Sequence, residues 1–190
     1  MARRHEGLRA GFSTHRAFEP KLIQPLFQTE DYARALLIGG GSPKVEEDVA
    51  ERMARQSILD RAFVTAVLDE EVLRRPIGSP AIMRDQLSHV LKVAERDNVL
   101  VHVIPATFDT GAYPGLDGAL TLLTGDDFGE VAYTESLGGG RLISSPREVA
   151  EFAILFTRIM GAVLPAGQSV ALIRRVMEEA FQSDDDVAEE

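Results

Sequence analysis

The side chains best able to do chemistry in this chain are carboxylates at the ends of predicted strands. Asp69-Glu70-Glu71 directly follows one apolar run, and Glu135 ends a later one, with Tyr133 two residues earlier on the same strand face. Strand ends can gather such charges around one cleft, where Arg74 or Arg75 would be the natural guanidinium partner. The cluster is either a structural ion pair or a ligand-contacting site, and both interpretations stay open.

Two further segments are candidate contact surfaces for a ligand or partner. The stretch Pro105–Gly118 is longer than most connections in a compact domain, so it is a candidate functional loop, with Tyr113 and Asp117 as its contact residues. An ordinary turn is the alternative for both. A predicted helix with the sequence QTEDYAR offers Gln28 and Tyr32.

No residue pattern in the chain indicates catalysis. His102 lies within an apolar strand and is predicted to be a hydrogen-bonded structural histidine, whereas His89 is expected on an exposed helix face. His5 and His15 lie in the basic N-terminal stretch, without the spacing of a metal site. We find no nucleophile elbow and no glycine-rich phosphate loop. We therefore predict no catalytic residue, no metal and no cofactor.

Composition indicates a globular protein and narrows the possible functions. The 190 residues are 45% hydrophobic and 26% charged, with no cysteine, so disulfides and thiolate sites are excluded. The net charge of −10 argues against nucleic-acid binding by this chain. No apolar run is long enough to span a membrane and no secretory signal is visible, so we expect a cytoplasmic location. We expect a basic segment at 1–16, one domain at 17–182 and an acidic tail at 183–190.

The elements predicted from apolar spacing form an α+β fold. Thr29 should cap a helix that ends at Gly39-Gly40-Gly41, and Ser42-Pro43 should open a second one. The runs Phe63–Leu68 and Val99–Ile104 read as buried parallel strands that flank a helix capped by Ser79, which makes one βαβ unit.

An antiparallel part of the sheet is predicted to follow. Leu120–Leu123 and Val131–Glu135 read as a hairpin, and Arg141–Ile143 as a short further strand. Ser145 with Glu148 resembles a capping box, and Ser169 is expected to cap the last helix. The predicted architecture is a small mixed sheet, built from the βαβ unit and the hairpin, with packed helices and a helical N-terminal third.

Five segments in register resemble one known family. They are FEPKLIQPLFQTEDYARALL at 18–37, DEEVLRRPIG at 69–78, MRDQLSHVLKVA at 83–94, VLVHVIPA at 99–106 and VAYTES at 131–136. Together they are similar to the domain of unknown function that follows an Xre-type helix-turn-helix in many actinobacterial transcriptional regulators, some of them described as antitoxin-like. The resemblance extends over about Ala17 to Phe181. It implies a homodimer and a small partner protein, and it brings no established ligand or catalytic residue.

The chain departs from that family at two places. Residues 1–16 are too short for a helix-turn-helix, so we expect contact with nucleic acid only through a module absent from this chain. In addition, Gln24-Pro25-Leu26-Phe27 stands where the family commonly has Pro-Gly-Leu-Leu, and the loss of that glycine affects the expected turn.

Three functional hypotheses follow from these observations. The leading one is a non-catalytic domain that senses an effector or partner within a bacterial transcriptional regulator. The alternative is a stand-alone, antitoxin-like interaction protein that neutralises a partner without binding DNA, for which an acidic surface would suit a basic partner. An enzyme would require a deep pocket in which Glu70 and Glu135 approach each other and raise one pKa.

Overall fold

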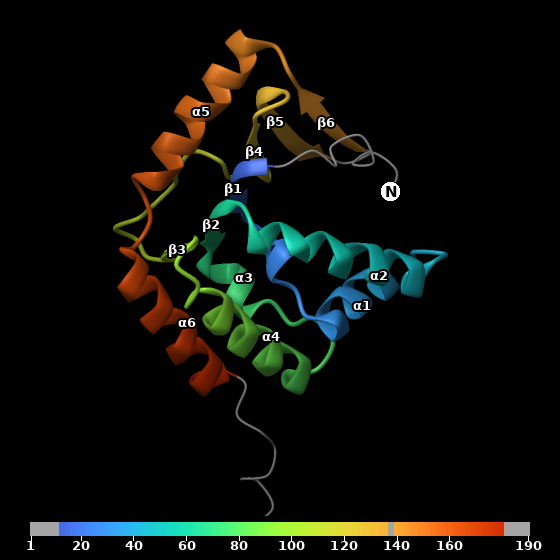
Figure 1. Ribbon diagram of the computed structural model, residues 1–190. Helices are drawn as coiled ribbons and strands as arrows, with labels where there is room; N and C mark the ends of the chain where they lie inside the picture. Colours follow the sequence, from blue (N-terminus) through green and yellow to red (C-terminus); the bar gives the residue numbers. More distant parts are fainter. Residues whose placement is uncertain (1–11, 137–138, 181–190) are drawn as a thin grey trace, which may run out of the picture.

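A six-stranded mixed sheet forms the centre of the molecule (Figure 1), described by a computed structural model over residues 12–136 and 139–180. The strand order is β3-β2-β1-β4-β5-β6. Strands β1, β2 and β3 are parallel, and β4, β5 and β6 continue the sheet in antiparallel pairs. Their bounds are Phe12–Glu19 for β1, Phe63–Asp69 for β2, Val99–Ile104 for β3, Leu120–Gly125 for β4, Gly129–Ser136 for β5 and Gly139–Ile143 for β6.

The first strand, β1, was not predicted, and it lies in the middle of the sheet. The N-terminal third therefore begins with a strand at Phe12–Glu19, while its helices at Glu30–Gly39 and Val45–Arg55 agree with the expectation. Residues 1–11 and the expected acidic tail lie outside the described residues. Strand β1 shows no apolar alternation because both of its faces carry polar side chains. Arg16 on one face pairs with Glu130 and lies 5.7 Å from the centre of the Phe156 ring.

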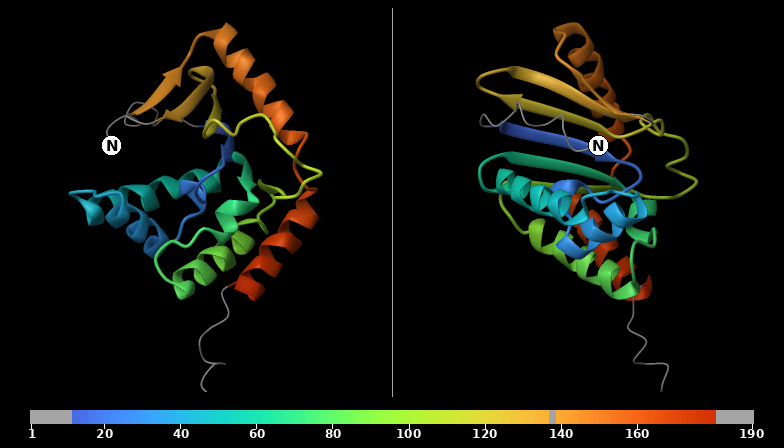
Figure 2. Two further views of the ribbon diagram at one scale, coloured as in Figure 1. Left: turned by 180° about the vertical axis from the view of Figure 1, so that it is seen from behind. Right: turned by 90° about the vertical axis from the view of Figure 1, so that its right-hand side faces the viewer.

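The helices surround this sheet unevenly (Figure 2). Helix α5 covers one face over β4 and β5, whereas α4 and α6 pack at the β2–β3 side. Their bounds are Glu30–Gly39 for α1, Val45–Arg55 for α2, Glu70–Arg74 for α3, Pro80–Val93 for α4, Pro146–Met160 for α5 and Ala166–Ala180 for α6, with short 3-10 turns η1 at Pro25–Phe27 and η2 at Gln56–Asp60. Within the described ranges, no helix has the length and apolar character needed to cross a membrane.

The predicted βαβ unit is confirmed as β2, α4 and β3, with β2 and β3 parallel. Ser79 caps α4, since its hydroxyl accepts a hydrogen bond from the Ile82 N–H at 3.2 Å, and Pro80 occupies the first helical turn. Met83, Leu87 and Val90 are buried on one face of α4, in a core they share with β2 and β3. A second core lies on the opposite face of the sheet, between β4, β5 and α5.

The hairpin of β4 and β5 and the short strand β6 are also confirmed. Two predicted helix caps are wrong. Ser145 makes no side-chain cap to α5, and Glu148, the other member of the expected capping box, forms an ion pair with Arg141 at 2.6 Å. Ser169 lies inside α6, where its hydroxyl accepts from the Val103 N–H at 3.0 Å and so ties the helix to the edge of β3.

Among the predictions for single residues, those for Thr29 and His102 are confirmed, and those for His89 and the start of α2 are wrong. Thr29 caps α1 as expected, with its hydroxyl accepting from the Tyr32 N–H at 3.3 Å. His102 is a structural histidine, since its Nδ1 lies 3.0 Å from the Leu164 carbonyl oxygen. His89 is half-buried rather than exposed, and burial lowers its pKa. Helix α2 begins at Val45, two residues after the expected Ser42-Pro43 start.

Candidate functional site

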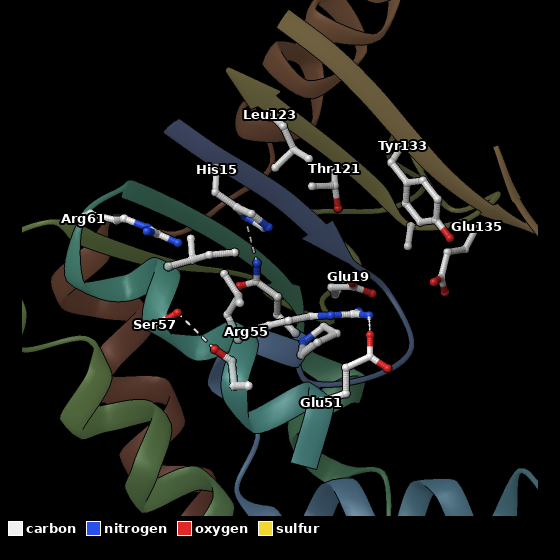
Figure 3. A pocket seen from close by; sticks show the side chains of 16 residues that line it. His15, Glu19, Glu51, Arg55, Ser57, Arg61, Thr121, Leu123, Tyr133 and Glu135 are labelled. Atoms are coloured by element: carbon white, nitrogen blue, oxygen red, sulfur yellow. Dashed lines mark hydrogen bonds and ion pairs between the residues drawn. The ribbon is translucent and has the colours of Figure 1, made fainter. Parts of the chain in front are cut away.

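A cavity of about 510 Å³ lies between the sheet and the helical layer formed by η1, α2 and η2 (Figure 3). Strand alternation builds its sheet side, because every second residue of β1, β4 and β5 points the same way. The polar and aromatic side chains on this side are His15, Glu19, Thr121, Tyr133 and Glu135. The opposite wall comes from α2 and the adjoining turns, with Leu26 and Ile58 as apolar residues and Glu51 and Arg55 as charged ones.

Glu19, which lines this cavity, has a strongly raised pKa. Burial is the first cause, the negative charge of Glu135 adds to it, and the cation of Arg52 opposes both, so that the pKa of Glu19 rises from 4.5 to about 8. Neither Glu19 nor Glu135 forms an ion pair within residues 12–136 and 139–180. Glu19 is therefore mostly a neutral carboxylic acid at neutral pH, at the end of the central strand.

Arg52 is held behind the cavity by a buried glutamine. Its Nη1 donates to Gln28 Oε1 at 2.7 Å, and Gln28 Nε2 donates to the Ile23 carbonyl at 2.6 Å. Burial lowers the pKa of the Arg52 guanidinium, although that group remains charged. Arg55, one turn further along α2, pairs with Glu51, so these two charges largely neutralise each other.

A buried amide on the cavity wall has an unused acceptor. Gln24 is 1% exposed, and its Nε2 lies 3.1 Å from His15 Nδ1. In the part of the chain that the structure describes, Gln24 Oε1 has no hydrogen-bond partner. A buried acceptor without a donor costs free energy, so this oxygen is a place where a ligand N–H or O–H group would be stabilised.

Gly140 makes room for the phenol of Tyr133. A Cβ at position 140 would overlap the ring and hydroxyl of Tyr133, which lies one strand away on β5. The pair fixes where the aromatic side chain enters the cavity. Gly140 on β6 thus has a packing role.

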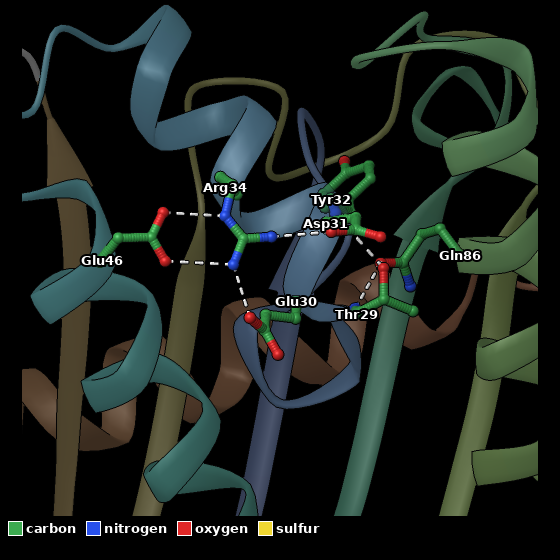
Figure 4. Close-up of polar contacts among 7 residues, drawn as sticks. All are labelled: Thr29, Glu30, Asp31, Tyr32, Arg34, Glu46 and Gln86. Carbon is green, nitrogen blue, oxygen red and sulfur yellow. Dashed lines mark hydrogen bonds and ion pairs between the residues drawn. The ribbon is translucent and has the colours of Figure 1, made fainter.

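The helical layer is fastened to the rest of the fold by polar contacts (Figure 4). Gln86 on α4 accepts from the Thr29 N–H at 2.8 Å and donates to the Phe27 carbonyl at 2.6 Å, which locks the junction of η1 and α1. Arg34 on α1 joins Asp31 at 2.7 Å and Glu46 of α2 at 2.9 Å. These contacts set the position of α2 and so of the cavity wall.

The structure separates the site residues predicted from the sequence. Tyr133 and Glu135 line the cavity together, but Glu70 and Tyr113 line a second cavity, of about 790 Å³, below the loop 105–118. Glu70 is paired with Arg74 at 3.0 Å, which is the structural ion pair that was left open. Glu70 and Glu135 therefore do not share a cavity, and the arrangement that an enzyme built on these two acids would require is not present.

The predicted contacts Asp117, Gln28 and Tyr32 line neither cavity. Asp117 is exposed on the loop, whereas Tyr113, at the second cavity, donates to the Asp69 carboxylate. Gln28 and Tyr32 are almost completely buried, with the Tyr32 hydroxyl accepting from the Ile23 N–H at 3.2 Å. Burial removes both from any contact with a partner at the surface, and Gln28 instead positions Arg52.

Sequence reasoning missed Glu19, His15 and Gln24, although all three precede or lie within the segment that carries the family resemblance. The available signal was the unexplained pair of acid and amide in FEPKLIQ, next to a stretch of aromatic and β-branched residues. Within the described residues, no three His, Asp or Glu side chains gather as a metal site would require.

Comparison with known proteins gives one match. A family model described as Domain of unknown function (DUF5753) matches residues 7–175. No curated protein and no solved structure matches the chain.

Proposed function

We propose that this chain, which belongs to the DUF5753 family, is a non-catalytic sensing domain that binds a small molecule in the cavity between the sheet and α2. The observation that carries the proposal is the cavity itself. It combines apolar walls with a few converging polar groups, one of which has a strongly raised pKa. Small-molecule sites have this composition.

The position of α2 supports a sensing role. Helix α2 forms one wall of the cavity and is connected to α1 through Arg34 and Glu46. A ligand that contacts both the sheet and α2 would favour one position of α1 and α2 relative to the sheet over other positions. The position of the outer surface of α1 and α2 would then depend on whether a ligand occupies the cavity.

The regulatory context rests on the family resemblance of the five sequence segments. In that context the domain acts inside a bacterial transcriptional regulator in the cytoplasm, and two copies present DNA-reading modules to two half-sites. Light scattering coupled to size exclusion tests the dimer on this chain directly. A particle mass equal to that of a single chain would contradict this part of the proposal.

Ligand binding is tested by filling the cavity from an exposed position. Ala54 lines the cavity on α2, and Ala50 is an exposed alanine one turn earlier that does not line it. We expect low-molecular-weight fractions of a bacterial extract to raise the melting temperature of the unmodified protein and of Ala50→Phe, but not of Ala54→Phe. Equal responses of all three proteins would place binding elsewhere.

An acid–base enzyme is the second candidate, favoured by the protonated Glu19 near the charged Glu135. A general acid at neutral pH needs a carboxyl group of this kind. The two functions differ in the fate of the ligand. Mass spectrometry of a bound extract fraction after prolonged incubation would show an unchanged compound for a sensor and a converted one for an enzyme.

A further inference from the structure

We propose that the ligand is an organic cation, with its ammonium group held between Glu19 and Glu135 and its apolar body against Leu26, Ile58 and Leu123. This inference rests on the proposed binding function and specifies the chemical class of the ligand. Figure 3 shows Glu19 and Glu135 at the same end of the cavity, with Tyr133 beside them.

Ionisation of Glu19 would leave one negative charge without a counterpart at this end of the cavity. Glu19 and Glu135 contribute two carboxyl groups, and Arg52 behind them contributes one guanidinium that acts on Glu19. Glu51 and Arg55 on α2 are paired with each other. When both carboxyl groups are ionised, a single ligand cation therefore makes the net charge of these groups zero, whereas an anion would add to the repulsion between them.

Two further groups suit an ammonium ligand. The buried Gln24 Oε1, which has no partner among the described residues, can accept only from an N–H or O–H donor. The Tyr133 phenol provides an aromatic face, and aromatic faces attract cations at close range. The Gln24 acceptor is an observation independent of the acidic pair, and it also points to a donor in the cavity.

The titration of Glu19 gives the inference a measurable signature. The titratable and charged groups around the cavity are His15 on the same strand as Glu19, Tyr133 and Glu135 on β5, Arg52, Glu51 and Arg55 on α2, and Arg61 after η2, which Figure 3 shows away from the Glu19 and Glu135 end. An ammonium ligand would compensate the charge that burial now disfavours, so Glu19 would ionise on binding and its proton would pass to the buffer. The released proton comes from Glu19 alone, because the ammonium group of the ligand keeps its own protons.

The test uses three probes that share one body and differ in charge: phenylbutylamine, phenylbutanol and phenylbutyrate. In titration calorimetry on the complete chain we expect the amine to bind at least about tenfold more tightly than the alcohol, because its ammonium group makes a charge-assisted contact that the hydroxyl group lacks. We expect no binding of the carboxylate. Measured in two buffers of different ionisation enthalpy, amine binding at neutral pH should release a proton.

Matched variants separate the cation site from general effects. Glu19→Gln and Glu135→Gln should each weaken amine binding by about tenfold and leave the alcohol unaffected, and Glu19→Gln should also abolish proton release. Glu95→Gln changes an exposed acid just after α4 that lines neither cavity, so it is the control and should have no effect on binding. Alcohol or carboxylate binding as tight as that of the amine would overturn the inference.

The extract experiment distinguishes failure of this inference from failure of the proposed function. If an extract fraction stabilises the protein in a manner blocked by Ala54→Phe, its ligand is passed over a cation-exchange resin at neutral pH. Retention supports the cation, while a ligand in the flow-through overturns the cation and leaves the sensing role intact. No stabilising fraction at all would contradict the sensing role.

Discussion

Glu19 is the residue on which the candidate site depends. Its carboxyl group lies at the end of a central strand. Burial and the negative charge of Glu135 both raise its pKa, and the cation of Arg52 partly offsets them. The pKa of about 8 in the folded protein exceeds the ordinary value of 4.5. The folded state therefore binds more protons than the unfolded state between these pH values, and stability falls as pH rises through that window.

Glu19→Gln replaces the neutral acid by a neutral amide of similar shape and removes this pH dependence. We expect the variant to match the unmodified protein at about pH 5 and to be more stable by up to about 3 kcal/mol at about pH 9, because only the carboxylate suffers from burial. Urea unfolding at both pH values measures the difference. A variant equally destabilised at both values would show that the carboxyl group is needed for packing.

Gly140 is the second residue with a specific consequence. Gly140→Ala should lower the free energy of unfolding by about 1 to 3 kcal/mol, because the added methyl group overlaps the Tyr133 ring. When Tyr133→Ala is already present, Gly140→Ala should cost little further stability, since the ring that the methyl group would overlap is gone. Gly167→Ala is the control, because nothing lies within 4 Å of a Cβ there. Additive losses in the double variant would contradict this packing role.

At the scale of elements, two Ser-Pro helix starts look alike in sequence and differ in structure. Ser79 caps α4 with its hydroxyl, whereas Ser145 makes no side-chain cap to α5. The second member of the expected capping box is also engaged elsewhere. Glu148 should complete a capping box at α5, but it pairs with Arg141 on β6, a contact that exists only once the sheet has formed.

We expect Ser79→Ala to cost about 1 kcal/mol of stability and Ser145→Ala less than about 0.5 kcal/mol, since only the first substitution removes a cap hydrogen bond. Both sites keep a proline at the first helical turn, so the comparison isolates the hydroxyl. Denaturant unfolding of the two single variants is the measurement. Equal costs would mean that Ser145 caps its helix in solution.

For the whole molecule, the sheet order predicts how the fold opens. Strands β1 and β2 are paired on both sides, whereas β6 pairs only with β5, and α1 and α2 lie away from both hydrophobic cores for much of their length (Figure 1). In hydrogen exchange we expect the slowest amides in β1 and β2 and the fastest ordered ones in β6 and α2. Amides of β6 protected as strongly as those of β1 would indicate that another chain covers this edge.

Local patterns in the sequence were sufficient to predict the elements whose apolar residues recur at the spacing of a helix or a strand. The apolar runs of β2 and β3, the one-sided apolar face of α4 and the Thr29 and Ser79 caps are all present as predicted. Each depends on interactions between residues close in the chain or on burial of an entire strand. Such interactions leave a periodic trace in the sequence.

Tertiary structure alone decided the place of β1 and, with it, the site. Arg16 is tolerated in a central strand because Glu130 and Phe156 receive it, and these partners are more than a hundred residues away in the chain. Glu19 and Glu135 meet for the same reason, whereas Glu70 stays at the other cavity with Arg74. Charge compensation between distant residues has no periodicity, so the sequence by itself determined the α+β framework and the folded chain determined which acids face one another.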